Sequence, residues 1–243
     1  MASAWPSNGW IPVACAGLLV GAAFGLAAHA SAQPAVARSV GAFEAVALRA
    51  PVDLVLRQAA RTAVEVRADD AVQPLIVTEV VDGARGPTLE IRLQPGARLP
   101  FAATVRVSVD VVNLRALAVE GSGDVRGVGL KVADLDVAIA GSGDVHLNDL
   151  LADAVTARIA GSGDLELSGR STRLSATIAG SGDVDASALD ATQVAVRISG
   201  SGDALVRAAS TLDVTIAGSG DVSYVGNPRL TQRIAGSGAV RQR

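Results

Sequence analysis

The stretch A-I-A-G-S-G-D-V, residues 138–145, contains the corner motif that decides the fold we predict. G-S-G-D begins at Gly121, Gly141, Gly161, Gly180, Gly200 and Gly218, and a seventh copy, G-S-G-A, begins at Gly236. The spacings between neighbouring copies are 20, 20, 19, 20, 18 and 18 residues. A period this constant indicates that each unit is one coil of a stack.

Apolar residues flank each corner at positions of one parity. Four residues before and four residues after the first glycine the side chain is apolar in nearly every copy, and Gln232 is the exception. Two residues before the glycine it is always β-branched: Val119, Ile139, Ile159, Ile178, Ile198, Ile216 and Ile234. Because successive side chains of a strand point to opposite faces, each repeat is predicted to carry strands with an apolar inner face.

This pattern predicts an all-β fold, a parallel β-solenoid with coils of about 18–20 residues, in which each strand pairs with its equivalent one coil on. Propeller blades repeat at about 40 residues or more, which is twice this period. The composition fits a narrow interior, because 49% of residues are hydrophobic but only 2% are aromatic. Stacked Val, Ile, Leu and Ala columns would fill such an interior without large rings.

The corner residues suit a tight turn between stacked strands. Glycine reaches backbone conformations that other residues avoid, and Ser and Asp bond nearby backbone groups. Stacking should also align the aspartates of the motif in a column with neighbours about 5 Å apart. The members of this aspartate column are Asp124, Asp144, Asp164, Asp183, Asp203 and Asp221.

The N-terminal segment differs from the rest of the chain. Residues 1–32 contain no Asp, Glu, Lys or Arg, and 11–28 are apolar, which predicts a signal peptide. An A-x-A site at Ala30 and Ala32 places cleavage before Gln33, although the usual basic start is missing. An uncleaved membrane anchor is the alternative. The lone Cys15 excludes a disulfide framework.

We predict three further parts of the chain. Residues 33–42 form a short tether, and residues 43–243 form a single β-solenoid domain. Within it, 43–112 should add three or four less regular coils, because their strand-like segments alternate apolar and polar residues between prolines. Residues 113–243 carry the G-S-G-D repeats.

The repeated G-S-G-D-V corners, with F-E-A-V-A-L-R-A-P-V-D-L-V-L-R at 43–57 and V-D-G-A-R-G-P-T-L-E-I-R-L at 81–93, resemble a known bacterial family. This is the family of auto-transporter adhesin head GIN domains, and the resemblance covers roughly Phe43 to Val240. The resemblance implies a right-handed β-helix behind an export signal, with adhesion as the suggested role. It assigns no catalytic residues.

The aspartate column is the sharpest candidate site, and it has three interpretations. Retaining glycosidases use carboxylate pairs about 5 Å apart, and carboxylate rows also bind calcium. The interpretation we favour is structural, with each Asp capping its own corner. A uniform column gives its acids no distinct environments, whereas acid and base roles require separated pKa values.

Other polar residues give weaker signals. His146 is the only histidine after residue 32, and its parity points it outward. We interpret the motif serines, from Ser122 to Ser237, first as corner residues and only second as catalytic nucleophiles. Phe43, Phe101 and Tyr224 are the aromatic residues after residue 32, which weakens a lectin-like interpretation. We therefore assign no catalytic, cofactor-binding or metal residue, and no cofactor.

The function predicted from the sequence is a non-enzymatic exported scaffold for cell-envelope or extracellular interaction, with adhesion as one such role. A polysaccharide-active β-helix enzyme and a calcium-binding solenoid are the alternatives. The net charge of −3 argues against nucleic acid as a partner. We expect a periplasmic or extracellular location, no membrane span after signal cleavage, and an envelope or surface protein or glycan as partner. Arg241 and Arg243 either guard the last strand edge or border a site of end-to-end self-association.

Overall fold

The structure is a computed structural model that describes residues 34–83, 85–101 and 103–243. The predicted signal peptide, residues 1–32, lies outside the described residues. The first half of the described chain forms β1 (Ala35–Arg38), β2 (Ala45–Arg49), β3 (Asp53–Gln58), β4 (Ala63–Arg67), the 3-10 helix η1 (Gln73–Leu75), β5 (Ile76–Gly83), β6 (Gly86–Leu93) and β7 (Arg106–Val111).

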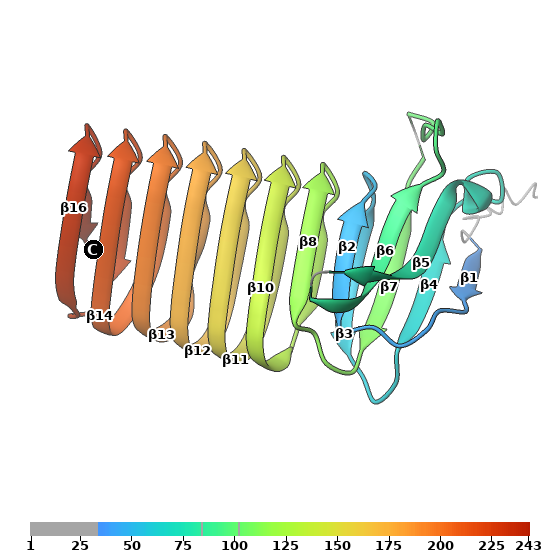
Figure 1. The fold of residues 1–243 in the computed structure, drawn as a ribbon, viewed down its shortest axis with the longest axis horizontal. Coiled ribbons are helices and arrows are strands. Elements are labelled where there is room, and N and C mark those ends of the chain that lie inside the picture. The colour runs from blue at the N-terminus through green and yellow to red at the C-terminus, as the bar shows by residue number, and fades with distance from the viewer. Residues whose placement is uncertain (1–33, 84, 102) are drawn as a thin grey trace, which may run out of the picture. The chain divides into compact units, whose positions relative to one another are not determined.

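The second half contains the repeats. Its strands are β8 (Ala116–Gly121), β9 (Val125–Val128), β10 (Lys131–Gly141), β11 (Val145–Gly161), β12 (Leu165–Gly180), β13 (Val184–Gly200), β14 (Ala204–Gly218), β15 (Val222–Val225), β16 (Arg229–Gly236) and β17 (Val240–Gln242). Neighbouring repeats pair in parallel and in register, so that Gly141 lies beside Gly161 and Gly161 beside Gly180. The predicted parallel β-solenoid is confirmed (Figure 1).

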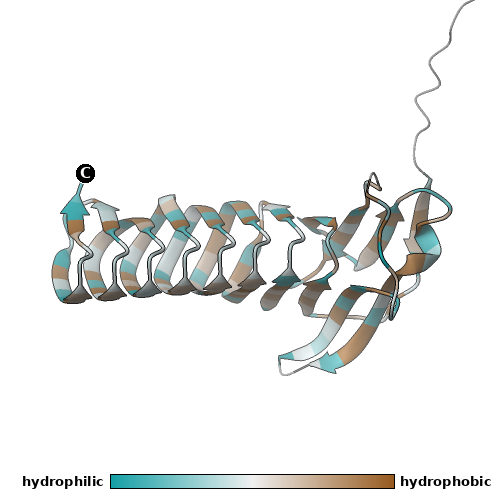
Figure 2. Cartoon of the chain, turned by 90° about the horizontal axis from the view of Figure 1, so that it is seen from above, coloured by the Kyte–Doolittle hydropathy of each residue, from teal (hydrophilic) through white to brown (hydrophobic). Residues whose placement is uncertain are grey.

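The interior of the stack is lined by the predicted apolar columns. The β-branched residues two before each corner are at most 2% exposed from Val119 to Ile216. Figure 2 shows hydrophobic and hydrophilic residues alternating along the strands of each coil. In the last coil Ile234 is 40% exposed, because no described strand covers it. The core is thus continuous along the stack and opens at its C-terminal end.

From the second corner onward, two glycines per corner are required by how closely the coils approach. Gly161 has φ +140°, and a Cβ at this position would clash with the carbonyl oxygen of Gly141. Gly163 is not left-handed, but a Cβ there would clash with the carbonyl oxygen of Gly143. The first glycine is therefore needed for its backbone angle and for space, and the second for space alone.

The N-terminal strands correct our expectation of three or four further coils. Two coil-like strand pairs exist, β2 with β3 and β6 with β7, and they do not stack in chain order. Strand β2 lies between β6 and β8, and β3 lies between β7 and β9 (Figure 1). The first coil of the chain is therefore inserted between the second and the repeats.

Antiparallel strands complete this end of the stack. β4 pairs with β7, β1 pairs with β4, and β5 forms a hairpin with β6. Part of the segment predicted as a tether, 33–42, is therefore a strand of the fold. Arg38 of β1 donates to the carbonyl and side-chain oxygens of Gln73, at 2.8 and 2.9 Å, which attaches β1 to η1.

None of the helical structure in the described part of the chain is both long and apolar enough to cross a membrane.

Candidate functional site

The six carboxylates of the aspartate column share one hydrogen-bonding arrangement. Oδ1 of each Asp accepts a bond from the backbone N–H at the equivalent position of the next coil, over 2.7–3.2 Å. Asp164, for example, accepts from the N–H of Asp183 at 2.8 Å. We expected each Asp to cap its own corner, and the bond instead reaches the next coil. The spacing aligned donor and acceptor, but it could not show that the carboxylate bonds across coils, because that depends on how closely two corners approach.

This arrangement occupies Oδ1 in all six aspartates of the column. The second oxygen, Oδ2, takes part in an ion pair at the last member, where Arg241 donates to Asp221 at 2.7 Å. The carboxylates share an equivalent backbone donor, and Asp221 differs from the others by its ion pair with Arg241. The aspartate column therefore links neighbouring coils and leaves a row of carboxylate oxygens at the surface.

The motif serines lie beside the column with their side chains at the surface. All seven, from Ser122 to Ser237, are exposed. From Ser142 onward, their backbone N–H groups donate to the carbonyl of the first glycine of the preceding coil, as from Ser162 to Gly141 at 2.9 Å. The corner therefore uses the backbone of the serine, and the hydroxyl row is presented to solvent.

His146 points outward, as its parity predicted. Its Nδ1 lies 2.9 Å from Oε2 of Glu166, the residue aligned with it in the next coil. The pairing of His146 with Glu166 was not predicted from the sequence. The position of Glu166, one period after His146, was the available signal, since stacked residues at one repeat position are neighbours.

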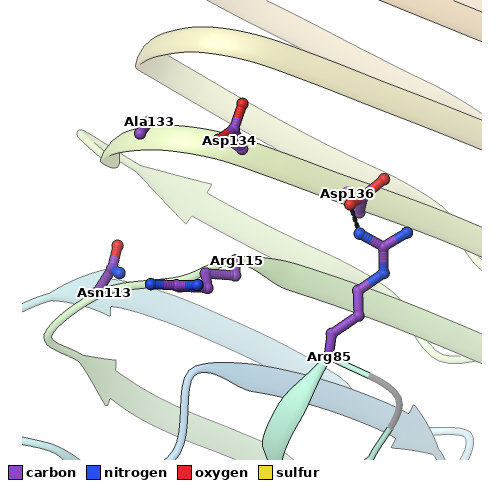
Figure 3. A pocket seen from close by; sticks show the side chains of 6 residues that line it. All are labelled: Arg85, Asn113, Arg115, Ala133, Asp134 and Asp136. Atoms are coloured by element: carbon purple, nitrogen blue, oxygen red, sulfur yellow. Dashed lines mark ion pairs between the residues drawn. The ribbon is translucent and has the colours of Figure 1, made fainter.

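A pocket of about 440 Å³ lies where the β5–β6 hairpin meets the outer surface of the repeats. Figure 2 shows the tip of this hairpin standing away from the stack. The pocket is lined by Arg85, Asn113, Arg115, Ala133, Asp134 and Asp136. In Figure 3 the Arg85 side chain reaches from the hairpin to Asp136 on β10, with which it forms an ion pair.

The charges of this pocket are largely paired. Asp136 also accepts from Arg158 at 3.3 Å, and Arg115 lies 3.0 Å from Glu44. No sequence pattern indicated the pocket, because its residues come from three separate segments and no repeat relates Arg85 to Asp136. The ion pair between Arg85 and Asp136 links the β5–β6 hairpin to the repeats.

The remaining candidates are placed as follows. Phe43 is buried, Tyr224 is half-buried, and Phe101 is fully exposed. Across residues 34–83, 85–101 and 103–243, no group of three or more His, Cys, Asp or Glu side chains is arranged to hold a metal ion. At the C-terminal end, the outer edges of β16 and β17 pair with no other described strand. End-to-end self-association there stays a prediction.

The fold is shared with solved structures of low sequence identity. A protein from Bacteroides fragilis described as a "putative adhesin" aligns with a TM-score of 0.81 and 21% identity, covering 88% of this chain and 98% of that one. A "putative adhesin" from Parabacteroides merdae aligns with a TM-score of 0.67 and 20% identity, covering 88% and 97%. A "putative lipid binding protein" from Parabacteroides distasonis aligns with a TM-score of 0.72 and 24% identity, covering 88% and 98%.

No curated protein matches the sequence. The family described as "Putative auto-transporter adhesin, head GIN domain" matches residues 42–228. That range contains the G-S-G-D corners from Gly121 to Gly218 and the strands from β2 to β15. Because the match spans most of the chain and the structure has the stacked coils that the repeats predict, the chain belongs to the family of auto-transporter adhesin head GIN domains.

Proposed function

We propose that this protein is an exported, non-enzymatic scaffold that presents the outer surface of a rigid solenoid to a partner at the cell envelope or outside the cell, as an adhesin does. The observation that carries the proposal is the uniform use of the aspartate column. Each carboxylate links its coil to the next through the same bond, so the most acidic feature of the surface is engaged in holding the stack together.

Two further observations support an interaction scaffold. Parallel pairing in register aligns equivalent outward side chains, so the surface offers the same spacing over several coils. Similar solved structures are described as "putative adhesin" proteins. The export of the chain is proposed from the apolar segment 11–28 and the A-x-A site before Gln33.

The test compares binding with turnover. The purified protein is measured against envelope glycans and surface proteins by surface binding, and against the same glycans by release of reducing ends. We expect binding without release. The double variant Asp144→Asn and Asp164→Asn should fold and bind as the parent does, because Asn retains a carbonyl oxygen as acceptor.

Two results would overturn the proposal. One is glycan cleavage by the parent protein that disappears in the folded double variant, which would make the column catalytic. The other is the absence of binding to every glycan and surface protein of the envelope. A Ser122→Ala variant serves as the matched surface control, since its hydroxyl lies beside the column.

A further inference from the structure

One outer face of the repeats is rich in arginine. We call it the arginine face, and it consists of the outward side chains of residues 154–160, 173–179, 193–199, 211–217 and 229–235, which lie side by side in β11, β12, β13, β14 and β16. It contains one acidic residue, Asp213, and five arginines: Arg158, Arg173, Arg197, Arg229 and Arg233. The face is therefore positively charged, although the whole chain carries −3.

The arginines have few partners within the protein. Arg158 pairs with Asp136 at 3.3 Å, and Asp136 is shared with Arg85. The other four arginines are exposed and form no ion pair with a described residue. The acids of the aspartate column lie on the other side of the corner, whereas Asp134 and Asp136 of β10 border the face at its N-terminal side. An exposed, unpaired guanidinium is available for an external anion.

The register spaces three of the arginines evenly. They belong to one column along the stack, in the order Arg158, Thr177, Arg197, Thr215 and Arg233. Each step between parallel strands is about 4.8 Å, so consecutive arginines of this column are about 10 Å apart. A threonine hydroxyl lies between each pair. The column thus alternates a cation with a neutral hydrogen-bonding group.

A groove accompanies the arginine column. Thr156, Ser175 and Ala195 are aligned in the neighbouring column, and their short side chains leave a depression of about 240 Å³. Arg173 and Gln193 line its far side, and Asp213 closes it toward the C-terminal end. The depression runs across several coils, which suits an extended chain better than a compact molecule.

We propose that the arginine face binds a linear anionic polysaccharide, which lies along the stack with its acidic groups paired to Arg158, Arg197 and Arg233. The inference rests on the proposed function and names the class of partner. The arginine spacing is comparable to the repeat of a disaccharide in an extended glycan, and the threonine and serine hydroxyls match sugar hydroxyls between the charges.

The same geometry disfavours nucleic acid. Duplex DNA carries one charge per about 1.7 Å of its axis, far denser than this column of arginines. Single strands are usually held by aromatic side chains on which bases stack, and the arginine face contains no aromatic residue. Nucleic acid is therefore an outcome that the test must distinguish.

The experiment measures binding to hyaluronan, a linear glycan with one carboxylate per disaccharide, with neutral dextran and duplex DNA as comparison polymers. We expect binding to hyaluronan that weakens with added salt, and weaker binding to both comparisons. The double variant Arg197→Gln and Arg233→Gln should lose about tenfold in affinity, since two exposed ion pairs are removed. Asp213→Asn should bind more tightly, because it removes the one negative charge of the groove.

The matched control is the double variant Arg98→Gln and Arg126→Gln, which makes the same change in net charge outside the arginine face. We expect its affinity to equal that of the parent, with circular dichroism confirming that every variant folds. Equal losses in both double variants, equal binding to dextran, tighter binding to DNA, or no effect of Asp213→Asn would each overturn the inference. If hyaluronan fails to bind while another envelope partner binds at a different face, the inference fails and the proposed function stands.

Discussion

At the residue scale, the corner glycines and aspartates act between coils rather than within one. The glycines permit the carbonyl of one coil to approach the next, and the aspartates accept a backbone N–H that this geometry brings within reach. Both residue types recur because every coil has the same neighbour. A change at one corner therefore alters the contact between two coils.

Replacement of Asp164 separates its two properties, charge and hydrogen bonding. We expect Asp164→Ala to lower the free energy of unfolding by about 1 kcal/mol, because the N–H of Asp183 loses its acceptor at an exposed position. Asp164→Asn keeps an acceptor and removes one of the aligned negative charges, so it should remain within about 0.5 kcal/mol of the parent. Urea unfolding measures the free energy of unfolding of both variants.

The control is Asp213→Ala, which removes an exposed carboxylate without a backbone bond. Equal losses of stability in Asp164→Ala and Asp164→Asn would contradict the role of the acceptor.

At the scale of elements, the N-terminal strands form an end that differs from the repeats. Charged side chains link β5, β6, β2 and β8, in the order Glu79, Arg92, Glu90, Arg49 and Glu120. The hydrogen bond with Glu79 raises the pKa of the Arg92 guanidinium above its ordinary value. These contacts connect the β5–β6 hairpin and the inserted coil to the first repeat. No repeated corner makes that connection at this end of the stack.

Arg38 is the polar anchor of β1, and its replacement tests this end. Arg38→Ala should destabilise the protein by about 1–3 kcal/mol, because Gln73, only 8% exposed, loses two hydrogen bonds. Hydrogen exchange should accelerate in β1 and β4 while the repeats from β11 to β14 keep their protection. Arg61→Ala removes an exposed arginine and serves as the control. Uniform acceleration over the whole chain would show that β1 is not a local element.

At the scale of the whole molecule, stability should be distributed along the stack. Each repeat contacts only its neighbours, so the free energy is approximately a sum of coil terms and interface terms. The last coil is the most exposed part of the repeats, with Ile234 40% and the rest of β16 largely exposed. Its loss should therefore remove one interface and leave the others intact.

Deletion of residues 227–243 tests this additivity. We expect the shortened protein to remain folded, with a melting temperature lower by a few degrees, because β14 and β15 become the terminal strands. Deletion of residues 34–75 is the comparison, and it should abolish folding, since it removes β2 and β3 from between their neighbours. Circular dichroism and sedimentation report folding and association. Complete unfolding on loss of the last coil would refute the additive description.

The coils from β8 onward could be predicted from the sequence alone. Residues such as Ile159 and Ile178 lie one period apart, and a stack brings equivalent positions together, so the period and the parity sufficed to predict their burial and pairing. Where no period exists, alternation indicates only which face of a strand is inward. It could not show that β2 lies between β6 and β8, because strand neighbours without a repeat depend on the packing of the whole end.

In the candidate sites, too, some contacts could be predicted from the period and others required the tertiary structure. The alignment of Asp144 with Asp164 followed from their spacing, but the backbone bond between them depended on the exact approach of two corners. The pairing of Arg85 with Asp136 and the groove beside Arg197 required the tertiary structure, since they combine residues that local pattern does not relate. Periodic contacts can be predicted from the chain because each coil has the same geometry as its neighbour. Contacts that occur once are decided only when all the elements have packed.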